Sequence, residues 1–246
     1  MKEKLHTIPI QDAFSKDCEC PVCELYRKLE ENAINYTIGP GASYMEGDIR
    51  EQSDREGFCQ KHLKKLYEYP NKLGIAMMLK THMDKTIKDL EKASKASLPK
   101  PNSMFKKKEV QSHPVTDYIG NLQKECFVCG YINQSFQSYI MTIFYLYERE
   151  EDFRKQFADS KGFCMDHYKI LFEKAPSYLG KKYLEEFLNT LNRIFMENFK
   201  RVRDDLEWFI QKNDYRFKDE PWKNGRDALP RALTKVGSIL EEEEKK

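Results

Sequence analysis

The strongest constraint on this 246-residue chain is a pattern of cysteine and histidine pairs that occurs twice. The C-x2-C pair at 20–23 (CPVC) recurs at 126–129 (CFVC), 106 positions later. The GFC-x2-H element at 57–62 recurs at 162–167, 105 positions later. The same offset relates further landmarks downstream: Pro70 with Pro176, and Leu73-Gly74 with Leu179-Gly180. We infer two copies of one unit of roughly a hundred residues.

Hydrophobic periodicity within each copy is helical. Apolar residues follow each pair at spacings of three and four, which predicts that every Cys-Cys pair and every Cys-His pair opens a helix. Pro70 and Pro176 are expected to end the helices that follow the Cys-His pairs. A long amphipathic helix then runs from Leu184 to Phe209 in the second copy, with a weaker version in the first. Because no stretch alternates like a strand, we predict an all-α fold.

The domain organisation follows from the repeat. We expect two tandem, pseudo-symmetric helical repeats, each clipped by a CxxC…CxxH metal site, plus an irregular C-terminal segment. Their expected bounds are 1–97 and 116–213, joined by a linker at 98–115 and followed by the segment 214–246. Three prolines mark the linker, whose lysines 106–108 are expected to be a solvated loop. A short helix is expected from about Pro230 to Leu240.

The ligand types point to zinc. Three thiolates and one imidazole in tetrahedral arrangement suit Zn²⁺, and residues at i and i+3 on a first helical turn face the same ion. The helix N-terminus also favours thiolates. We expect two Zn²⁺ per chain, each held within one copy; the two predicted sets are Cys20, Cys23, Cys59, His62 and Cys126, Cys129, Cys164, His167. Such closed sites are structural, although an iron–sulfur centre and a dithiol redox role stay open.

The remaining cysteine and histidines have no place in the repeat. The counterpart of Cys18 in the second copy is Lys124, so we expect Cys18 to be a spare thiol. His6, His82 and His113 are expected to face solvent or to lie in the linker.

These motifs resemble an uncharacterised bacterial family of unknown function. In that family a CPxC element and GFCxxH elements recur and are followed by a DYR…EPW…DA…R stretch. Here the last of these runs from Asp214-Tyr215-Arg216 through Glu220-Pro221-Trp222 to Arg231. The resemblance covers nearly the whole chain and implies no activity. The second copy departs from CPxC at Phe127, which leaves both ligands in place.

A second candidate site lies in the C-terminal segment. Guanidinium groups beside aromatic rings suit a carboxylate or phosphate, and the candidate residues are Tyr215, Arg216, Trp222, Arg226 and Arg231. The alternative is a segment strapped over the helices, with its arginines paired to Asp219, Glu220 and Asp227.

Composition and missing motifs narrow the function. Lysine and arginine number 42 against 40 acidic residues, so no bulk charge attracts nucleic acid or an anionic membrane. We found no phosphate-binding loop, dinucleotide fingerprint or hydrolase motif, and no secretion signal or membrane span. We therefore expect a cytoplasmic binding or scaffolding module rather than an enzyme, with a protein or a small anionic ligand as partner. The alternatives are a thiol/zinc redox sensor, or a ligand-binding protein or enzyme that uses residues 215–231.

Overall fold

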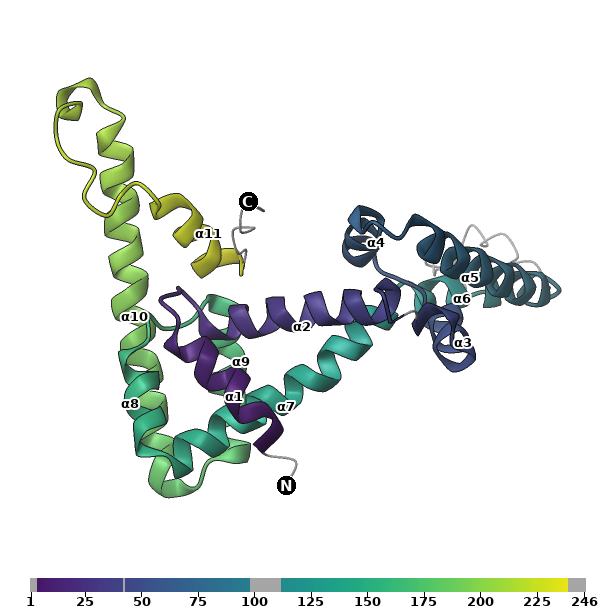
Figure 1. Ribbon diagram of the computed structural model, residues 1–246, viewed down its shortest axis with the longest axis horizontal. Coiled ribbons are helices and arrows are strands. Elements are labelled where there is room, and N and C mark those ends of the chain that lie inside the picture. Colours follow the sequence, from purple (N-terminus) through teal and green to yellow (C-terminus); the bar gives the residue numbers. More distant parts are fainter. Residues whose placement is uncertain (1–3, 42, 98–111, 239–246) are drawn as a thin grey trace, which may run out of the picture. The chain divides into compact units, whose positions relative to one another are not determined.

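The computed structural model of the protein describes residues 4–41, 43–97 and 112–238. Within these residues it contains α-helices and two short 3-10 helices but no strand (Figure 1), which confirms the all-α expectation. The helices are α1 (Lys4–Ser15), α2 (Pro21–Ile38), η1 (Ser43–Met45), α3 (Gly47–Glu56), α4 (Gln60–Glu68), α5 (Lys72–Ala93), α6 (Pro114–Leu122), α7 (Phe127–Arg149), α8 (Glu151–Asp159), α9 (Met165–Tyr178), α10 (Lys181–Lys212), η2 (Tyr215–Phe217) and α11 (Ala228–Gly237).

The chain forms two compact units that differ from the two sequence copies. Unit 1 combines Met1–Lys28 with Ser135–Lys246, and unit 2 is Leu29–Gln134. The boundary falls inside α2 and inside α7. Each unit therefore takes residues from both copies of the repeat.

Helices begin where the cysteine pattern predicts. The helices α2 and α7 start one residue after Cys20 and Cys126, and α4 and α9 start one residue after Cys59 and Cys164. The predicted long helix of the second copy is also confirmed, because α10 is continuous over 32 residues. Its weaker counterpart in the first copy is α5, with 22 residues.

Unit 1 is built around α10, which packs against α8, α9 and α11. Its core is rich in aromatic rings that lie edge-to-face, tilted or stacked; the buried ones are Phe14, Phe136, Phe144, Tyr147, Phe153, Phe157, Phe163 and Phe187. Rings of this size each bury a large apolar area. Unit 1 therefore has a substantial hydrophobic core apart from any metal.

Unit 2 has a smaller core of mostly aliphatic side chains. Its α5 packs against α3, α4 and α6. The buried apolar residues besides Cys126 are Leu29, Ala33, Ile34, Ile38, Ile49, Leu66, Ile75, Met78, Phe127, Val128 and Ile132. With a single buried phenylalanine among them, this unit gains less stabilisation from aromatic burial than unit 1 does.

Several local expectations need correction. Pro176 does not end its helix, because α9 continues to Tyr178 with the proline inside its last turn. Pro114 does not belong to a linker; it is the first residue of α6, where its missing N–H costs nothing. The lysines at 106–108 lie outside the described residues. The expected C-terminal helix is present as α11, and the helical rhythm breaks after α10 as expected.

Candidate metal centres

The predicted metal ligands gather in two clusters. Site 1 consists of Cys20, Cys23, Cys164 and His167, and site 2 consists of Cys59, His62, Cys126 and Cys129. In each set one ligand atom from every residue lies within 4.8 Å of all the others. Site 1 belongs to unit 1 and site 2 to unit 2.

The predicted pairing of ligands within each copy is wrong. The CxxC pair of each copy joins the CxxH pair of the other copy. The division follows the compact units. The helix α2 starts beside Cys20 in unit 1 and continues into unit 2, where Cys59 and His62 lie; α7 starts beside Cys126 in unit 2 and continues into unit 1, where Cys164 and His167 lie. Each Cys-His pair therefore meets the cysteine pair of the other copy.

Every ligand pair lies at a helix N-terminus. Cys59 and Cys164 are N-cap residues, with His62 and His167 one turn into the helix. The backbone N–H of His167 donates to Cys164 Sγ at 3.4 Å. Helix N-termini present free N–H groups and partial positive charge, and both stabilise thiolates.

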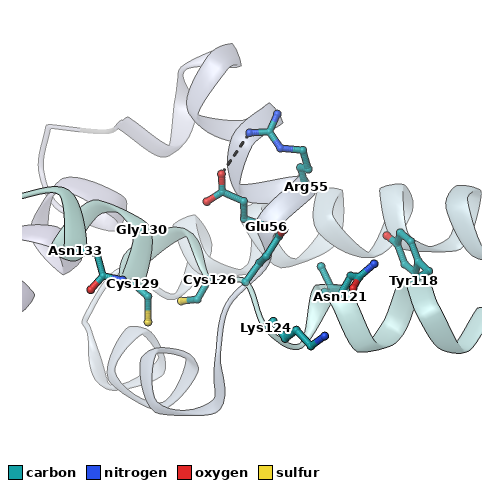
Figure 2. Close-up of a pocket in the computed structure, with 11 residues that line it drawn as sticks. Arg55, Glu56, Tyr118, Asn121, Lys124, Cys126, Cys129, Gly130 and Asn133 are labelled. Atoms are coloured by element: carbon teal, nitrogen blue, oxygen red, sulfur yellow. Dashed lines mark hydrogen bonds and ion pairs between the residues drawn. The ribbon is translucent and has the colours of Figure 1, made fainter.

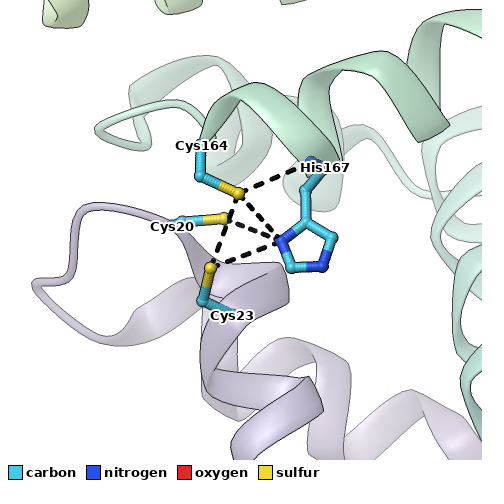
Figure 3. A group of neighbouring side chains, drawn as sticks. All are labelled: Cys20, Cys23, Cys164 and His167. Atoms are coloured by element: carbon cyan, nitrogen blue, oxygen red, sulfur yellow. Dashed lines mark hydrogen bonds between the residues drawn. The ribbon is translucent and has the colours of Figure 1, made fainter. Parts of the chain in front are cut away.

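The side chains of site 1 converge on one another (Figure 3), and all four residues are buried. His167 Nδ1 faces the sulfur atoms of Cys20, Cys23 and Cys164 at 3.5, 3.3 and 3.1 Å, respectively. The Sγ atoms of Cys23 and Cys164 are 3.6 Å apart. A tetrahedral zinc with Zn–S near 2.3 Å and Zn–N near 2.0 Å separates sulfur from nitrogen by about 3.5 Å and sulfur from sulfur by about 3.8 Å. The donor set of site 1 fits this geometry within a few tenths of an ångström.

Site 2 has the same arrangement. His62 Nδ1 lies 3.3, 3.4 and 3.3 Å from the sulfur atoms of Cys59, Cys126 and Cys129. The Sγ atoms of Cys59 and Cys129 are 3.9 Å apart. The donors, three sulfurs and one imidazole nitrogen, also fit tetrahedral zinc.

The glycine of each GFCxxH element has a specific role. Gly57 and Gly162 have φ of 61° and 73°, a left-handed conformation that glycine adopts without strain. At Gly162 a Cβ atom would also lie 3.0 Å from the backbone oxygen of Ile194. The carbonyl of Gly57 accepts the N–H of Phe127 at 3.0 Å, which fastens the start of α7 beside site 2. The first copy has Pro21 at this position, which has no N–H to donate.

A carboxylate supports the histidine of site 2. With Nδ1 at the sulfurs, His62 Nε2 carries the proton and donates it to Glu30 Oε1 at 3.2 Å. Lys61 and Lys65 pair with the same carboxylate at 2.7 and 2.6 Å. Burial opposes ionisation of Glu30, but the hydrogen bonds from His62 and the two lysines outweigh it and hold the pKa of Glu30 far below its usual value.

The repeat places different residues at the equivalent positions beside site 1. Glu30 corresponds to Phe136 at the offset of 106, and the ring of Phe136 packs against His167 with centroids 5.6 Å apart. Lys61 and Lys65 correspond to Asp166 and Ile170 at the offset of 105. None of the three residues of the Glu30–Lys61–Lys65 group is therefore kept beside site 1. The role of Glu30 and the two lysines could have been predicted from the sequence only if the contact between Glu30 and His62 had been known.

A buried charge network borders site 1. The carboxylate of Glu19, adjacent to Cys20, accepts from Arg201 Nη2 at 2.6 Å and lies 3.2 Å from Lys235 Nζ. Lys235, on α11, is 2% exposed and donates to the backbone oxygens of Glu19 and Lys161. Burial lowers the pKa of Lys235 despite the nearby Glu19. No local sequence pattern predicts this network, because its residues lie far apart in the chain.

The histidines of both clusters have raised pKa values. Burial disfavours the protonated form of His62, but hydrogen bonds to Cys126 and Glu30 outweigh this and raise its pKa to about 9. The pKa of His167 rises to about 10 because hydrogen bonds to Cys164 and Cys20 likewise outweigh burial. Metal binding to such sites releases protons, so the affinity for the ion falls as the pH falls.

The candidate residues of the C-terminal segment differ in their contacts and exposure. Tyr215 is 86% exposed, and Arg216 pairs with Asp214 at 2.7 Å rather than with Asp219 or Glu220. The Lys212 ammonium lies over the ring of Trp222 at 5.7 Å. Arg226 is exposed. Arg231 is turned to Asp205 and Asp227, at 2.8 and 2.9 Å, which confirms the expected pairing with Asp227.

The residues outside the repeat stay outside the clusters. The Sγ atom of Cys18 contacts the carbonyl of Ala13, and burial raises the pKa of this thiol to about 12. Three histidines have structural contacts that were not expected: His6 packs on Tyr139, His82 Nδ1 bonds the Asp54 carbonyl, and His113 caps α6.

The fold and the clusters define an all-α protein with two Cys3His sets suited to metal ions. A family model matches residues 1–243, and the chain belongs to this family, described as a family of unknown function (DUF6062). Comparison with curated proteins and with solved structures found no match. No helix in the described part of the chain has both the length and the apolar character needed to cross a membrane.

Proposed function

We propose that this protein binds two zinc ions in structural Cys3His sites and acts as a binding or scaffolding module in the reducing cytoplasm. The observation that carries the proposal is the geometry of sites 1 and 2, in which four protein donors converge at tetrahedral spacing. Free cysteines in this number fit a reducing compartment, where thiols serve as metal ligands.

Zinc is favoured over other metals by the donor type. Sulfur-rich sets with one imidazole are common for structural zinc, whereas iron–sulfur clusters are usually held by cysteines alone. Four protein donors complete a tetrahedral shell and leave no position for a water molecule or a substrate. A site of this kind supports a structural role rather than catalysis by the ion.

The structural role of the ions is supported by the distance along the chain that each site spans. Site 1 joins residues up to 147 positions apart, and site 2 joins residues up to 70 apart. Binding an ion that only the folded chain can coordinate adds directly to folding stability. A ligand site built on residues 215–231 has less support, because Arg231 is already occupied by acidic partners.

Metal analysis tests this function. We expect protein purified under reducing conditions without added metal to contain two zinc ions per chain, measured by elemental and native mass spectrometry. Cobalt substitution should give the intense visible bands of tetrahedral coordination together with sulfur-to-cobalt charge transfer. A chelator that strips the metal should lower Tm and increase proteolysis. Iron in place of zinc, or an unchanged Tm after complete stripping, would contradict the proposal.

A further inference from the structure

The two metal centres differ in how well their thiolates are covered. All three cysteines of site 1 are buried: Cys20 and Cys164 are 0% exposed and Cys23 is 3% exposed. In site 2 only Cys126 is buried, at 7% exposure, while Cys59 and Cys129 are half-buried. The same donor set is therefore shielded in one unit and reachable in the other.

The end of α11 shields site 1. Ser238 Oγ lies 3.1 Å from Cys164 Sγ and 2.8 Å from Asp166 Oδ2, so its single hydroxyl proton is shared between the sulfur and the carboxylate. A hydrogen bond to a thiolate withdraws charge from the sulfur and lowers its nucleophilicity. The buried ammonium of Lys235 adds positive charge near Cys20. Steric cover and electrostatics both protect the sulfurs of site 1.

Site 2 borders an open cavity instead. A cavity of about 500 Å³ lies beside the start of α7 (Figure 2), and Cys126 and Cys129 form part of its wall. The rest of the wall is largely polar and includes Arg55, Glu56 and Lys124. A water-soluble reagent of small size therefore has room next to Cys129.

We propose that site 2 is a modification site at which small peroxides and other thiol-directed electrophiles react, releasing its ion while site 1 keeps its own. The inference rests on the proposed function, since both sites must hold zinc. The reaction begins at Cys129, which combines partial exposure with a place in the cavity wall.

The chemistry balances with a peroxide as the oxidant. The Cys129 thiolate attacks one peroxide oxygen; the O–O bond breaks, and the other oxygen leaves and takes a proton from water. The Cys59 thiolate, 3.9 Å away, then attacks the sulfur of the resulting sulfenic acid and displaces hydroxide. The two thiolates lose two electrons, the peroxide is reduced, and a Cys59–Cys129 disulfide forms. Only Cys126 and His62 remain as ligands, so the ion dissociates.

Release of zinc under limiting peroxide tests the inference. The zinc-loaded full chain is treated with hydrogen peroxide in the presence of a chromophoric chelator, and modified cysteines are mapped by peptide mass spectrometry. We expect one zinc per chain to be released about tenfold faster than the other. A Cys59–Cys129 disulfide should accompany the fast phase, and Cys20, Cys23 and Cys164 should stay reduced. N-ethylmaleimide should give the same selectivity by alkylation.

Two variants with a matched control probe the cause. Gly130→Leu places a side chain on the cavity wall, where a Cβ meets Glu56 Oε2 at 3.7 Å, and should slow the fast phase severalfold. Gly120→Leu, on α6 at a position where a Cβ would meet nothing within 4 Å, should not change it. Ser238→Ala should accelerate only the slow phase.

The outcomes separate this inference from the proposed function. Protein without two bound zinc ions would refute the function itself. Two bound ions that leave at equal rates, or earlier release from site 1, would overturn the inference alone. An identical fast phase in Gly130→Leu and Gly120→Leu would show that the cavity is not the route.

Discussion

At the residue scale, Glu30 explains how an imidazole is held in site 2. His62 is fixed on one side by the sulfurs and on the other by this carboxylate. A Cys3His set with zinc carries a net negative charge, so a bare carboxylate next to it would be repelled. Lys61 and Lys65 remove this repulsion by pairing with Glu30. Partners of this kind orient the ring and increase metal affinity.

We predict that Glu30→Gln weakens zinc binding at site 2 by about tenfold or more, because the amide keeps the shape but loses the charge that holds His62. Competition with a chelator of known affinity, read out in the cobalt-substituted protein, measures the effect. Glu68→Gln, an exposed acid on α4, is the control and should leave both affinities unchanged. Equal affinities in the two variants would show that Glu30 does not support the site.

At the element scale, α11 connects the end of the described chain to the first metal ligands. Its Lys235 reaches the backbone of Glu19, and its Arg231 pairs with Asp205 on α10. A lysine that is 2% exposed is costly unless its charge is matched. The Glu19 carboxylate provides that match in the structure, and a negatively charged site 1 would add to it.

We predict that Lys235→Met lowers the free energy of unfolding of unit 1 by about 3 kcal/mol, since it leaves Glu19 buried with fewer partners. Urea denaturation of the metal-loaded protein, followed by the aromatic signal of unit 1, measures the change. Lys200→Met, an exposed lysine on α10, should change it by less than about 0.5 kcal/mol. Similar midpoints for both variants would contradict the role given to Lys235.

The elements could be predicted wherever the pattern is local. A pair at i and i+3 needs a helical turn, so the starts of α2, α4, α7 and α9 follow from the cysteine spacing alone. Other elements depend on context. Proline is common both in linkers and at the first position of a helix, and Pro114 is the first residue of α6. Lys235 and Arg231 contact elements that are remote in sequence, so no local pattern predicts these contacts.

At the scale of the whole molecule, each metal site combines the CxxC pair of one copy with the CxxH pair of the other. This pairing could not be predicted from the sequence. Spacing shows which residues share a helical turn, but it does not show which two turns meet. That depends on α2 and α7, each of which begins in one compact unit and ends in the other. The eight ligands were thus predictable one by one, and their partition into two sites was not.

We predict that substitutions will reveal this partition through metal content. Cys20→Ser with Cys164→Ser damages only site 1 and should leave one zinc per chain after a chelator wash. Cys20→Ser with Cys59→Ser damages both sites and should leave none. Elemental analysis measures the content, and Cys18→Ser should retain both ions. The opposite result for the two double variants would restore pairing within each copy.

The ligands of site 2, residues 59 to 129, are enclosed in sequence by those of site 1, residues 20 to 167. This nesting imposes an order on biosynthesis. The inner set is complete once Cys129 has left the ribosome, whereas Cys20 and Cys23 emerge first and wait until His167 follows. The hydroxyl of Ser238, which bonds Cys164, arrives later still. Cys20 and Cys23 are therefore the thiols that stay without their partner ligands longest during synthesis. Neither copy of the repeat contains all four ligands of one site.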